Sequence, residues 1–359
     1  MGIYISILVF IIVLQIILKK TKLANIRALF VGIVSLVLIL FSALRSVDVG
    51  QDTSVYVERF KIISESSWKQ LVDLKDVVDF EIGYIIFNKV ISIISANEHI
   101  FLLIVSSIII VSTSLYVYRK SDIVWLSLFL FVALGFFGET MNIMRQMIAI
   151  AILLPSIKFI EERNIFKFTI LVAIASLFHL TAFSFLIIYP MSLIKINKKY
   201  YIGIVVSIAL LYVYADAIIF WSMKLLGYQD YLVNIGEGSG LGMISMLIFF
   251  LVLGLYYRQN LSNSELSDTN IKSYDVYINI LVVAIFINTI AIHFALAGRV
   301  MVYFTFHNII LLPKIIKTID NKWQKVIVSG VIILGITYYF VFKLLVDDGS
   351  GVVPYLFAR

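Results

Sequence analysis

The sequence predicts an all-α integral membrane protein, a polytopic helical bundle of about twelve transmembrane segments with a range of roughly 11 to 14. Of its 359 residues, 61% are hydrophobic and only 14% are charged, whereas soluble domains carry about 25% charged residues. The mean hydropathy is +1.02. Apolar runs of roughly 20 residues, long enough to cross the hydrocarbon core, recur along the chain. We therefore expect residues 1–359 to form a single transmembrane domain.

The apolar runs place the transmembrane segments in order. The runs on either side of His179 are too short for upright spans, so we expect a tight hairpin or a broken helix there. The N-terminal run lacks the basic region and small-residue cleavage site of a signal peptide, which makes it the first span. The predicted spans are residues 3–18, 28–44, 99–118, 123–138, 141–160, 165–178, 181–194, 200–217, 240–258, 274–296, 299–317 and 325–345.

The basic residues predict the orientation. The first loop contains Lys19, Lys20, Lys22 and Arg27 without an acidic residue, which places it in the cytoplasm. Alternation then puts both termini outside and the loop with Lys195, Lys198 and Lys199 inside. The net charge of +7 therefore reflects cytoplasmic loops between apolar runs, and no nucleic-acid partner is expected.

Two hydrophilic regions are expected outside. In the longer one, residues 45–98, residues 68–78 predict a short amphipathic helix on the membrane surface, and residues 81–95 predict a re-entrant or outer-face helix. The second external loop, residues 218–240, contains a Gly-Glu-Gly-Ser-Gly run and is a candidate lid.

Polar and ionisable residues next to the spans are predicted to gather in one layer on the outer face. Such residues are costly in a membrane, which makes each of them a candidate for function. The set comprises Arg45, Asp48, Asp52, Glu81, Glu139, Asn142, Arg145, His179, His293 and Arg299.

Most of these residues also have a structural interpretation. Arg45 and Arg299 are equally compatible with interfacial anchors whose guanidinium groups reach the headgroups. Asp48 and Asp52 flank Gly50 and fit a turn or a helix N-cap, and Glu139 fits a helix cap. His179 would serve equally to bind a carbonyl freed at the hairpin turn. Arg145 lies within an apolar run, so it requires a carboxylate, a phosphate or a water-filled cavity.

The residue types favour chemistry on phosphates. Arginine binds phosphate through paired N–H donors, and a neighbouring carboxylate or imidazole can remove a proton from an attacking hydroxyl. The layer therefore suits transfer from a lipid-linked diphosphate, with cations stabilising the leaving group. The sequence contains no cysteine and no His-Glu-x-x-His or glycine-rich phosphate motif, so no metal site and no cofactor are expected.

Several motifs resemble one family of membrane proteins. They are Leu44-Arg-Ser-Val-Asp-Val-Gly-Gln-Asp-Thr-Ser-Val-Tyr56, Phe60, Glu81-Ile-Gly-Tyr84, Phe87-Asn88, Arg145-Gln146, His179-Leu-Thr-Ala182, and Gly298-Arg299 with Tyr303. In order and spacing they resemble the EpsG-type, Wzy-like exopolysaccharide polymerases. The resemblance extends over nearly the whole chain and also makes it similar to polytopic glycosyltransferases that use lipid carriers.

The resemblance implies a glycosyltransferase of the bacterial cytoplasmic membrane. It would join undecaprenyl-diphosphate-linked oligosaccharide repeat units into exopolysaccharide, capsule or O-antigen at the outer face. A flippase and a chain-length regulator are candidate partners. A glycan ligase with a different acceptor and a flippase of the same lipid-linked sugar remain the alternatives.

The resemblance also suggests roles for individual residues. Arg145 and Arg299 would bind the diphosphate with Arg45 assisting, whereas Asp48, Asp52 and Glu81 would bind sugar hydroxyls or act as the base, with His179 as the rival base. The remaining expected substrate-binding residues are Tyr56, Tyr84, Glu139, Asn142, Gln146, His293 and Tyr303.

Overall fold

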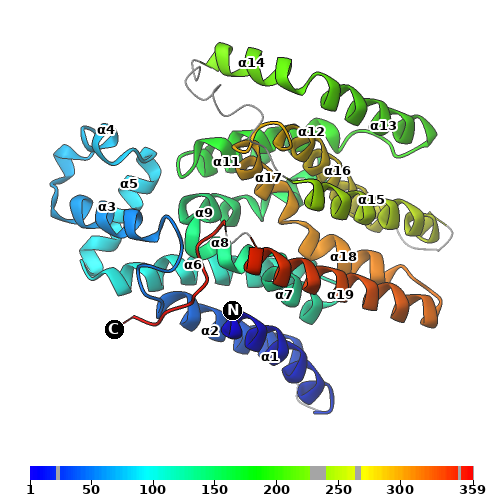
Figure 1. The fold of residues 1–359 in the computed structure, drawn as a ribbon, viewed down its shortest axis with the longest axis horizontal. Coiled ribbons are helices and arrows are strands. Elements are labelled where there is room, and N and C mark those ends of the chain that lie inside the picture. Colours follow the sequence, from blue (N-terminus) through cyan, green and yellow to red (C-terminus); the bar gives the residue numbers. More distant parts are fainter. Residues whose placement is uncertain (22–24, 227–239, 263–267, 347–348, 359) are drawn as a thin grey trace. The chain divides into compact units, whose positions relative to one another are not determined.

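The computed structural model describes residues 1–21, 25–226, 240–262, 268–346 and 349–358 (Figure 1). The described residues form helices and contain no strand, and one isolated antiparallel bridge joins Arg45 to Phe357. This confirms the all-α fold class. Whereas a single domain is expected from the sequence, the helices group into two compact units. Unit 1 comprises Met1–Ser156, Lys167–Phe183 and Asn321–Arg359, and unit 2 comprises Ile157–Phe166 and Ser184–Asp320.

Unit 1 is built around α7, which is buried on all sides from Leu126 to Ala133 because almost every residue in it is apolar. The long helices α1, α2 and α6 pack beside it and α19 covers part of it. The elements of this unit are α1 (Gly2–Lys19), α2 (Ile26–Ala43), α3 (Thr53–Glu65), η1 (Trp68–Gln70), α4 (Leu74–Val78), α5 (Ile82–Ile94), α6 (Glu98–Lys120), α7 (Val124–Ala133), α8 (Phe136–Asn142), α9 (Met144–Leu153), most of α11 (Ile165–Ser176) and α19 (Lys322–Val346).

Unit 2 is built around α16, whose residues from Val276 to Ile285 are almost all buried. Helices α13, α15, α17 and α18 pack against it. The elements of this unit are most of α10 (Ser156–Glu161), α12 (Ile188–Met191), α13 (Lys198–Val213), α14 (Ala215–Leu226), α15 (Leu241–Ser262), α16 (Asp268–Ala291), α17 (Ala297–Thr305) and α18 (Asn308–Lys317). The 3₁₀ helix η2 (Leu180–Ile187) crosses the boundary between the units.

The helices support a multi-pass membrane protein. In the described part of the chain, six helices are long and apolar enough to cross a membrane: α1, α2, α6, α15, α16 and α19. Up to nine spans result if each of three bent pairs, α7 with α8, α13 with α14, and α17 with α18, makes one span. Three shorter apolar helices lie at residues 82–94, 165–176 and 180–191. The count of about twelve stays a prediction.

The hydrophilic regions differ from the expectation in detail. Residues 68–78 do not form one amphipathic helix but two short ones, η1 and α4, and the longest helix formed by hydrophilic sequence there is α3. Residues 82–94 form the single helix α5, as expected for 81–95. In the second region, α14 continues to Leu226 where a loop was expected from residue 218, and residues 227–239 of the candidate lid lie outside the described residues.

Candidate active site

Glu81 lies at the centre of the best-formed polar cluster in unit 1. One carboxylate oxygen, Oε2, accepts a hydrogen bond from Arg145 at 2.6 Å. The other, Oε1, lies 3.1 Å from Nδ1 of His179 and accepts the backbone N–H of Leu180 at 2.9 Å. The side chains of Glu81, Arg145 and His179 are only 18–20% exposed. The structure therefore brings three of the predicted site residues together, from three segments distant in the sequence.

The backbone explains how these segments meet. Glu81 is the N-cap residue of α5, and His179 follows the last turn of α11, where the amide of His179 still bonds to the carbonyl of Ala175. Between them, Gly83 lets α5 approach closely, because a Cβ at this position would lie 2.6 Å from the carbonyl oxygen of Leu177. The break at His179 agrees with the broken helix expected from the sequence.

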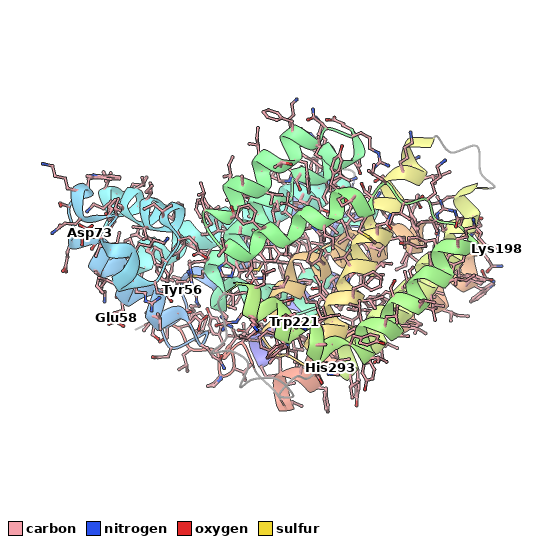
Figure 2. All side chains as sticks on the ribbon, turned by 90° about the horizontal axis from the view of Figure 1, so that it is seen from above. Tyr56, Glu58, Asp73, Lys198, Trp221 and His293 are labelled. Atoms are coloured by element: carbon pink, nitrogen blue, oxygen red, sulfur yellow. The ribbon has the colours of Figure 1, made fainter. Side chains whose placement is uncertain are left out.

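Arg145 lies over aromatic rings. Its guanidinium carbon is 4.4 Å from the ring centre of Phe80 and 6.0 Å from that of Tyr56, and these two rings stack at 5.6 Å. Tyr84 meets Phe80 edge-on at 5.1 Å. Figure 2 and the exposures agree that Tyr56 faces inward from α3, whereas Glu58 and Asp73 lie on the outside. The rings hold the guanidinium of Arg145 by cation–π attraction.

The charge state of Glu81 follows from these contacts. Burial raises the pKa of the carboxyl, but the hydrogen bond with His179 and the charge of Arg145 outweigh burial and hold its pKa at about 2. Glu81 is therefore ionised near neutral pH, and its oxygens are already occupied by three donors. Such a carboxylate orients its neighbours rather than accepting a proton.

The imidazole of His179 is left with one free nitrogen. With Nδ1 directed at Glu81, the neutral ring carries its hydrogen on Nδ1 and a lone pair on Nε2. In the described part of the chain, Nε2 has no hydrogen-bond partner. Carboxylate-oriented imidazole is the usual arrangement of a general base.

An interruption of the helix between α8 and α9 determines the position of Arg145. The helix stops at Asn142, and the carbonyl oxygen of Met141 is bonded instead by the hydroxyl of Thr53 at 2.6 Å and by Arg45 at 3.4 Å. The amide oxygen of Asn142 accepts the backbone N–H of Asp52 at 3.1 Å. Arg145 therefore lies in the first turn of the new helix α9, and Gln146 next to it is buried.

Arg45 is fully buried, with 0% exposure, so it is neither an interfacial anchor nor open to a ligand. It bonds to the carbonyl of Ser42 and to Met141, and its Nε has no partner among the described residues. Burial lowers the pKa of this guanidinium to about 10, although the nearby tyrosines Tyr355, Tyr4 and Tyr84 act in the opposite direction. Its position makes Arg45 part of the scaffold of the α8–α9 break.

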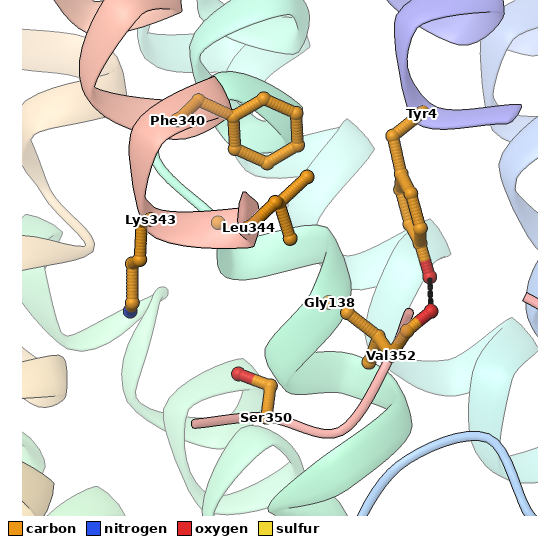
Figure 3. A pocket seen from close by; sticks show the side chains of 8 residues that line it. Tyr4, Gly138, Phe340, Lys343, Leu344, Ser350 and Val352 are labelled. Carbon is orange, nitrogen blue, oxygen red and sulfur yellow. Dashed lines mark hydrogen bonds between the residues drawn. The ribbon is translucent and has the colours of Figure 1, made fainter. Parts of the chain in front are cut away.

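The C-terminal segment, residues 349–358, covers this scaffold. It runs antiparallel to residues 44–51 through four backbone hydrogen bonds, and its Ser350 hydroxyl donates to Glu139 at 2.7 Å. Figure 3 shows the hydroxyl of Tyr4 donating to the carbonyl of Val352 at 3.0 Å. The pocket drawn there has about 20 Å³, room for about one water. Glu139 is therefore held by the C-terminal segment and does not cap α9.

The two aspartates of the loop are turn and N-cap residues. Asp48 is exposed and accepts a hydrogen bond from the hydroxyl of Ser46 at 2.9 Å. Asp52 is the N-cap residue of α3 but accepts no capping hydrogen bond with its side chain. Among the described residues, no interaction joins either aspartate to Arg145.

The remaining candidates belong to unit 2. Nδ1 of His293 lies 3.0 Å from a carboxylate oxygen of Asp216, and the ring of Tyr212 meets the imidazole edge-on at 5.1 Å. Arg299 is exposed at the start of α17, and Tyr303 is buried. That His293 and Arg299 share one layer with the residues of unit 1 stays a prediction.

Sequence reasoning missed three contributors. Phe80, Asp216 and the segment of residues 349–358 are not among the candidates. An aromatic residue directly before Glu81 was a usable signal for Phe80, but the other two pair with residues far away in the sequence, and periodicity carries no information about such pairs.

The cluster can perform two tasks. An arginine that lies over aromatic rings can bind a diphosphate and stabilise the charge that develops on it. An oriented imidazole can remove the proton of an attacking hydroxyl. In the described part of the chain, no group of three or more histidine, aspartate or glutamate side chains is arranged to hold a metal ion.

Comparison with known proteins identifies the relatives of this chain. It is 28% identical to the amylovoran biosynthesis protein AmsC of Erwinia amylovora over 192 residues, which are 53% of this chain and 50% of that protein. The chain thus matches about half the length of this curated relative. No solved structure matches the fold. The sequence model of the EpsG family matches residues 27–357, nearly the whole chain, and the protein therefore belongs to the EpsG family.

Proposed function

We propose that this protein is a membrane glycosyltransferase that joins undecaprenyl-diphosphate-linked repeat units into exopolysaccharide, capsule or O-antigen. The reaction takes place at the outer face of the bacterial cytoplasmic membrane. Membership of the EpsG family, the apolar helices and a relative named for amylovoran biosynthesis support this function. Donor and acceptor are both lipid-linked oligosaccharides.

The observation that carries the proposal is the contact of one carboxylate, Glu81, with both Arg145 and His179. Glycosyl transfer from a diphosphate needs a cation for the leaving group and a base for the acceptor hydroxyl. One oxygen of Glu81 contacts Arg145, the proposed cation, and the other contacts His179, the proposed base.

In the proposed step, the acceptor hydroxyl oxygen attacks the anomeric carbon of the donor chain. A new glycosidic C–O bond forms while the bond from the anomeric carbon to the diphosphate oxygen breaks. The hydroxyl proton passes to Nε2 of His179, and the electron pair leaves with the lipid diphosphate, whose negative charge Arg145 stabilises. Glu81 keeps the imidazole tautomer and the guanidinium in position.

The other predicted site residues receive supporting roles. Asp48 and Asp52 are assigned to sugar hydroxyls near the loop, and Tyr56, Tyr84 and Asn142 to the wall of the site. Arg45 supports the break that places Arg145, because it is buried under the C-terminal segment. That Arg299 and His293 of unit 2 bind substrate stays a prediction.

The test is the profile of lipid-linked glycans in cells that lack this gene and carry either the wild-type protein or Arg145→Ala. We expect single repeat units to accumulate on the lipid carrier and long chains to disappear with Arg145→Ala, because the leaving group loses its cation. Loss of an electrostatic stabiliser of this kind slows turnover by about 10²-fold or more.

Arg119→Ala is the matched control, because Arg119 is an exposed arginine at the end of α6. It should leave the profile unchanged at equal protein level. Long lipid-linked chains in the deletion strain would exclude polymerisation. Long chains that form but stay on the lipid carrier would instead indicate the ligase.

A further inference from the structure

A groove on unit 2 lies between the start of α13 and the face of α16. Its lining includes Lys195, Lys199, Tyr200 and Gly203 on one side and Val282 and Phe286 on the other, and its volume is about 400 Å³. It is distinct from the cluster at Glu81, whose residues all belong to unit 1. The groove is open because α13 is loosely packed, with only Tyr200 and Ile204 buried among its 16 residues.

The depth of the groove is apolar and unfilled. A Cβ added at Gly203 would meet nothing within 4 Å, so the space beside this position is open. A second apolar groove of about 510 Å³, between α13 and α15, lies on the other side of α13 and shares Ile204 with the first. Such hollows beside a lipid-facing helix accommodate acyl chains.

The mouth of the groove is basic. Lys195, Lys198 and Lys199 are exposed, and the sequence between Ser192 and Gly203 contains no acidic residue. Among the residues that the structure describes, no carboxylate forms an ion pair with these lysines. α13 also begins here, with Asn197 as its N-cap residue, so the positive end of the helix dipole adds to the same charge.

We propose that this groove binds an anionic phospholipid of the cytoplasmic leaflet. Its phosphate contacts Lys195 and Lys199, and an acyl chain lies against Gly203, Val282 and Phe286. Complementarity of charge selects the headgroup, since basic pockets between membrane helices on the cytoplasmic side bind anionic lipids. The polyprenyl diphosphate of the proposed reaction is a different ligand, because its headgroup lies at the outer face.

The geometry of unit 2 agrees with this placement. Figure 2 shows Lys198 at one end of the unit, away from Trp221 and His293. The basic end is the one that the distribution of lysine and arginine assigns to the cytoplasm. His293, which the sequence assigns to the outer layer, lies away from it.

The experiment measures binding of phosphatidylglycerol to the purified full chain by native mass spectrometry, with phosphatidylcholine as the neutral lipid. We expect wild type to retain phosphatidylglycerol preferentially. Lys195→Gln with Lys199→Gln should weaken this binding by about 30-fold, since each of the two lysines near a lipid phosphate contributes about 1 kcal/mol. Lys322→Gln with Lys325→Gln, the same charge change on the exposed Lys322 and the half-buried Lys325 at the start of α19, should not.

A second variant tests the acyl-chain part of the site. Gly203→Leu should fill the groove and also weaken binding, whereas Gly335→Leu on α19, where a Cβ likewise meets nothing within 4 Å, should not. Equal binding of both lipids, or unchanged binding in the lysine variant, would overturn the proposal. If the lysine change reduces binding but Gly203→Leu does not, the groove is not the acyl-chain site. If the variants lose a dimer rather than lipid, the occupant of the groove is a second copy of this chain. None of these readouts depends on polymerase activity.

Discussion

The contacts of Glu81 assign different tasks to residues that the sequence leaves interchangeable. Asp48, Asp52, Glu81 and His179 are all candidate bases by sequence. The ionised carboxylate of Glu81, with its pKa at about 2 and three donors on its oxygens, is the least suited of them to accept a proton. The imidazole, oriented through Nδ1, keeps Nε2 available.

Replacing His179, the proposed base, should therefore affect the reaction differently from replacing Glu81, which positions it. We expect His179→Gln to lower the polymerisation rate by about 10²-fold or more, since general-base catalysis contributes about 10²–10⁴. Glu81→Gln should lower it less, because the amide keeps the shape of the carboxylate but holds the imidazole and the guanidinium less firmly. The measurement is the rate of chain growth in membranes between pH 5 and 9.

Glu58→Gln is the control, an exposed carboxylate on α3 of the same outer region. Equal rates of chain growth in Glu81→Gln and the wild type would contradict the role of Glu81. The stability of the cluster has its own pH dependence. Because the pKa of Glu81 in the folded state lies below its ordinary 4.5, its ionised form stabilises the fold above about pH 4.5, and this contribution is lost as the pH falls towards 2.

At the scale of elements, the break between α8 and α9 decides where Arg145 lies. The freed carbonyl of Met141 is satisfied by Arg45, from the loop that follows α2, and by Thr53, the first residue of α3. Gly50 permits this contact for two reasons: its φ is +94°, and a Cβ would lie 2.3 Å from the carbonyl oxygen of Met141. The loop and the broken helix therefore fit only with glycine at this position.

Gly50→Ala should destabilise the protein more than a change that strains the backbone alone. Gly135→Ala is the matched control, because Gly135 has a φ of +87° with nothing within 4 Å of its Cβ. We expect the control to cost about 1 kcal/mol and Gly50→Ala about 1–3 kcal/mol more, from the clash with a backbone oxygen. Thermal unfolding in detergent measures the difference, and equal losses of Tm would show that the loop can move away from Met141.

At the scale of the whole molecule, the predicted orientation is directly testable because the chain contains no cysteine. Ser54→Cys lies at the exposed start of α3, in the region predicted outside, and Lys198→Cys lies in the basic loop predicted inside. An impermeant thiol reagent should label Ser54→Cys in intact cells, and Lys198→Cys only after the membrane is opened. The reverse pattern would invert the topology and remove the outer-face location of the site.

The helices themselves were largely predictable, because an apolar run as long as those of α1, α2, α6 and α16 predicts a membrane-spanning helix from its composition alone. The bends within predicted single spans, at residues 134–135, 214 and 306–307, were not, since each leaves the composition of the run unchanged. The choice of Glu81, Arg145 and His179 as candidate site residues followed from the cost of polar groups near a membrane.

Their pairing did not follow, because which atoms meet depends on tertiary packing. Arg45 shows the limit most clearly. Its sequence neighbourhood fits an exposed cation at the end of a span, but the segment of residues 349–358 buries it. The local sequence around Arg45 and that of residues 349–358 do not predict this contact.

That segment also sets the order in which the molecule can be completed during synthesis. Residues 349–358 leave the ribosome after α1 to α18 have been made, yet they supply the hydrogen bonds that close the loop after α2 and hold Glu139. Until then the guanidinium of Arg45 lacks its cover. We therefore expect a chain cut short before this segment to insert its helices but to lack the hydrogen bonds that fix the loop beside the α8–α9 break.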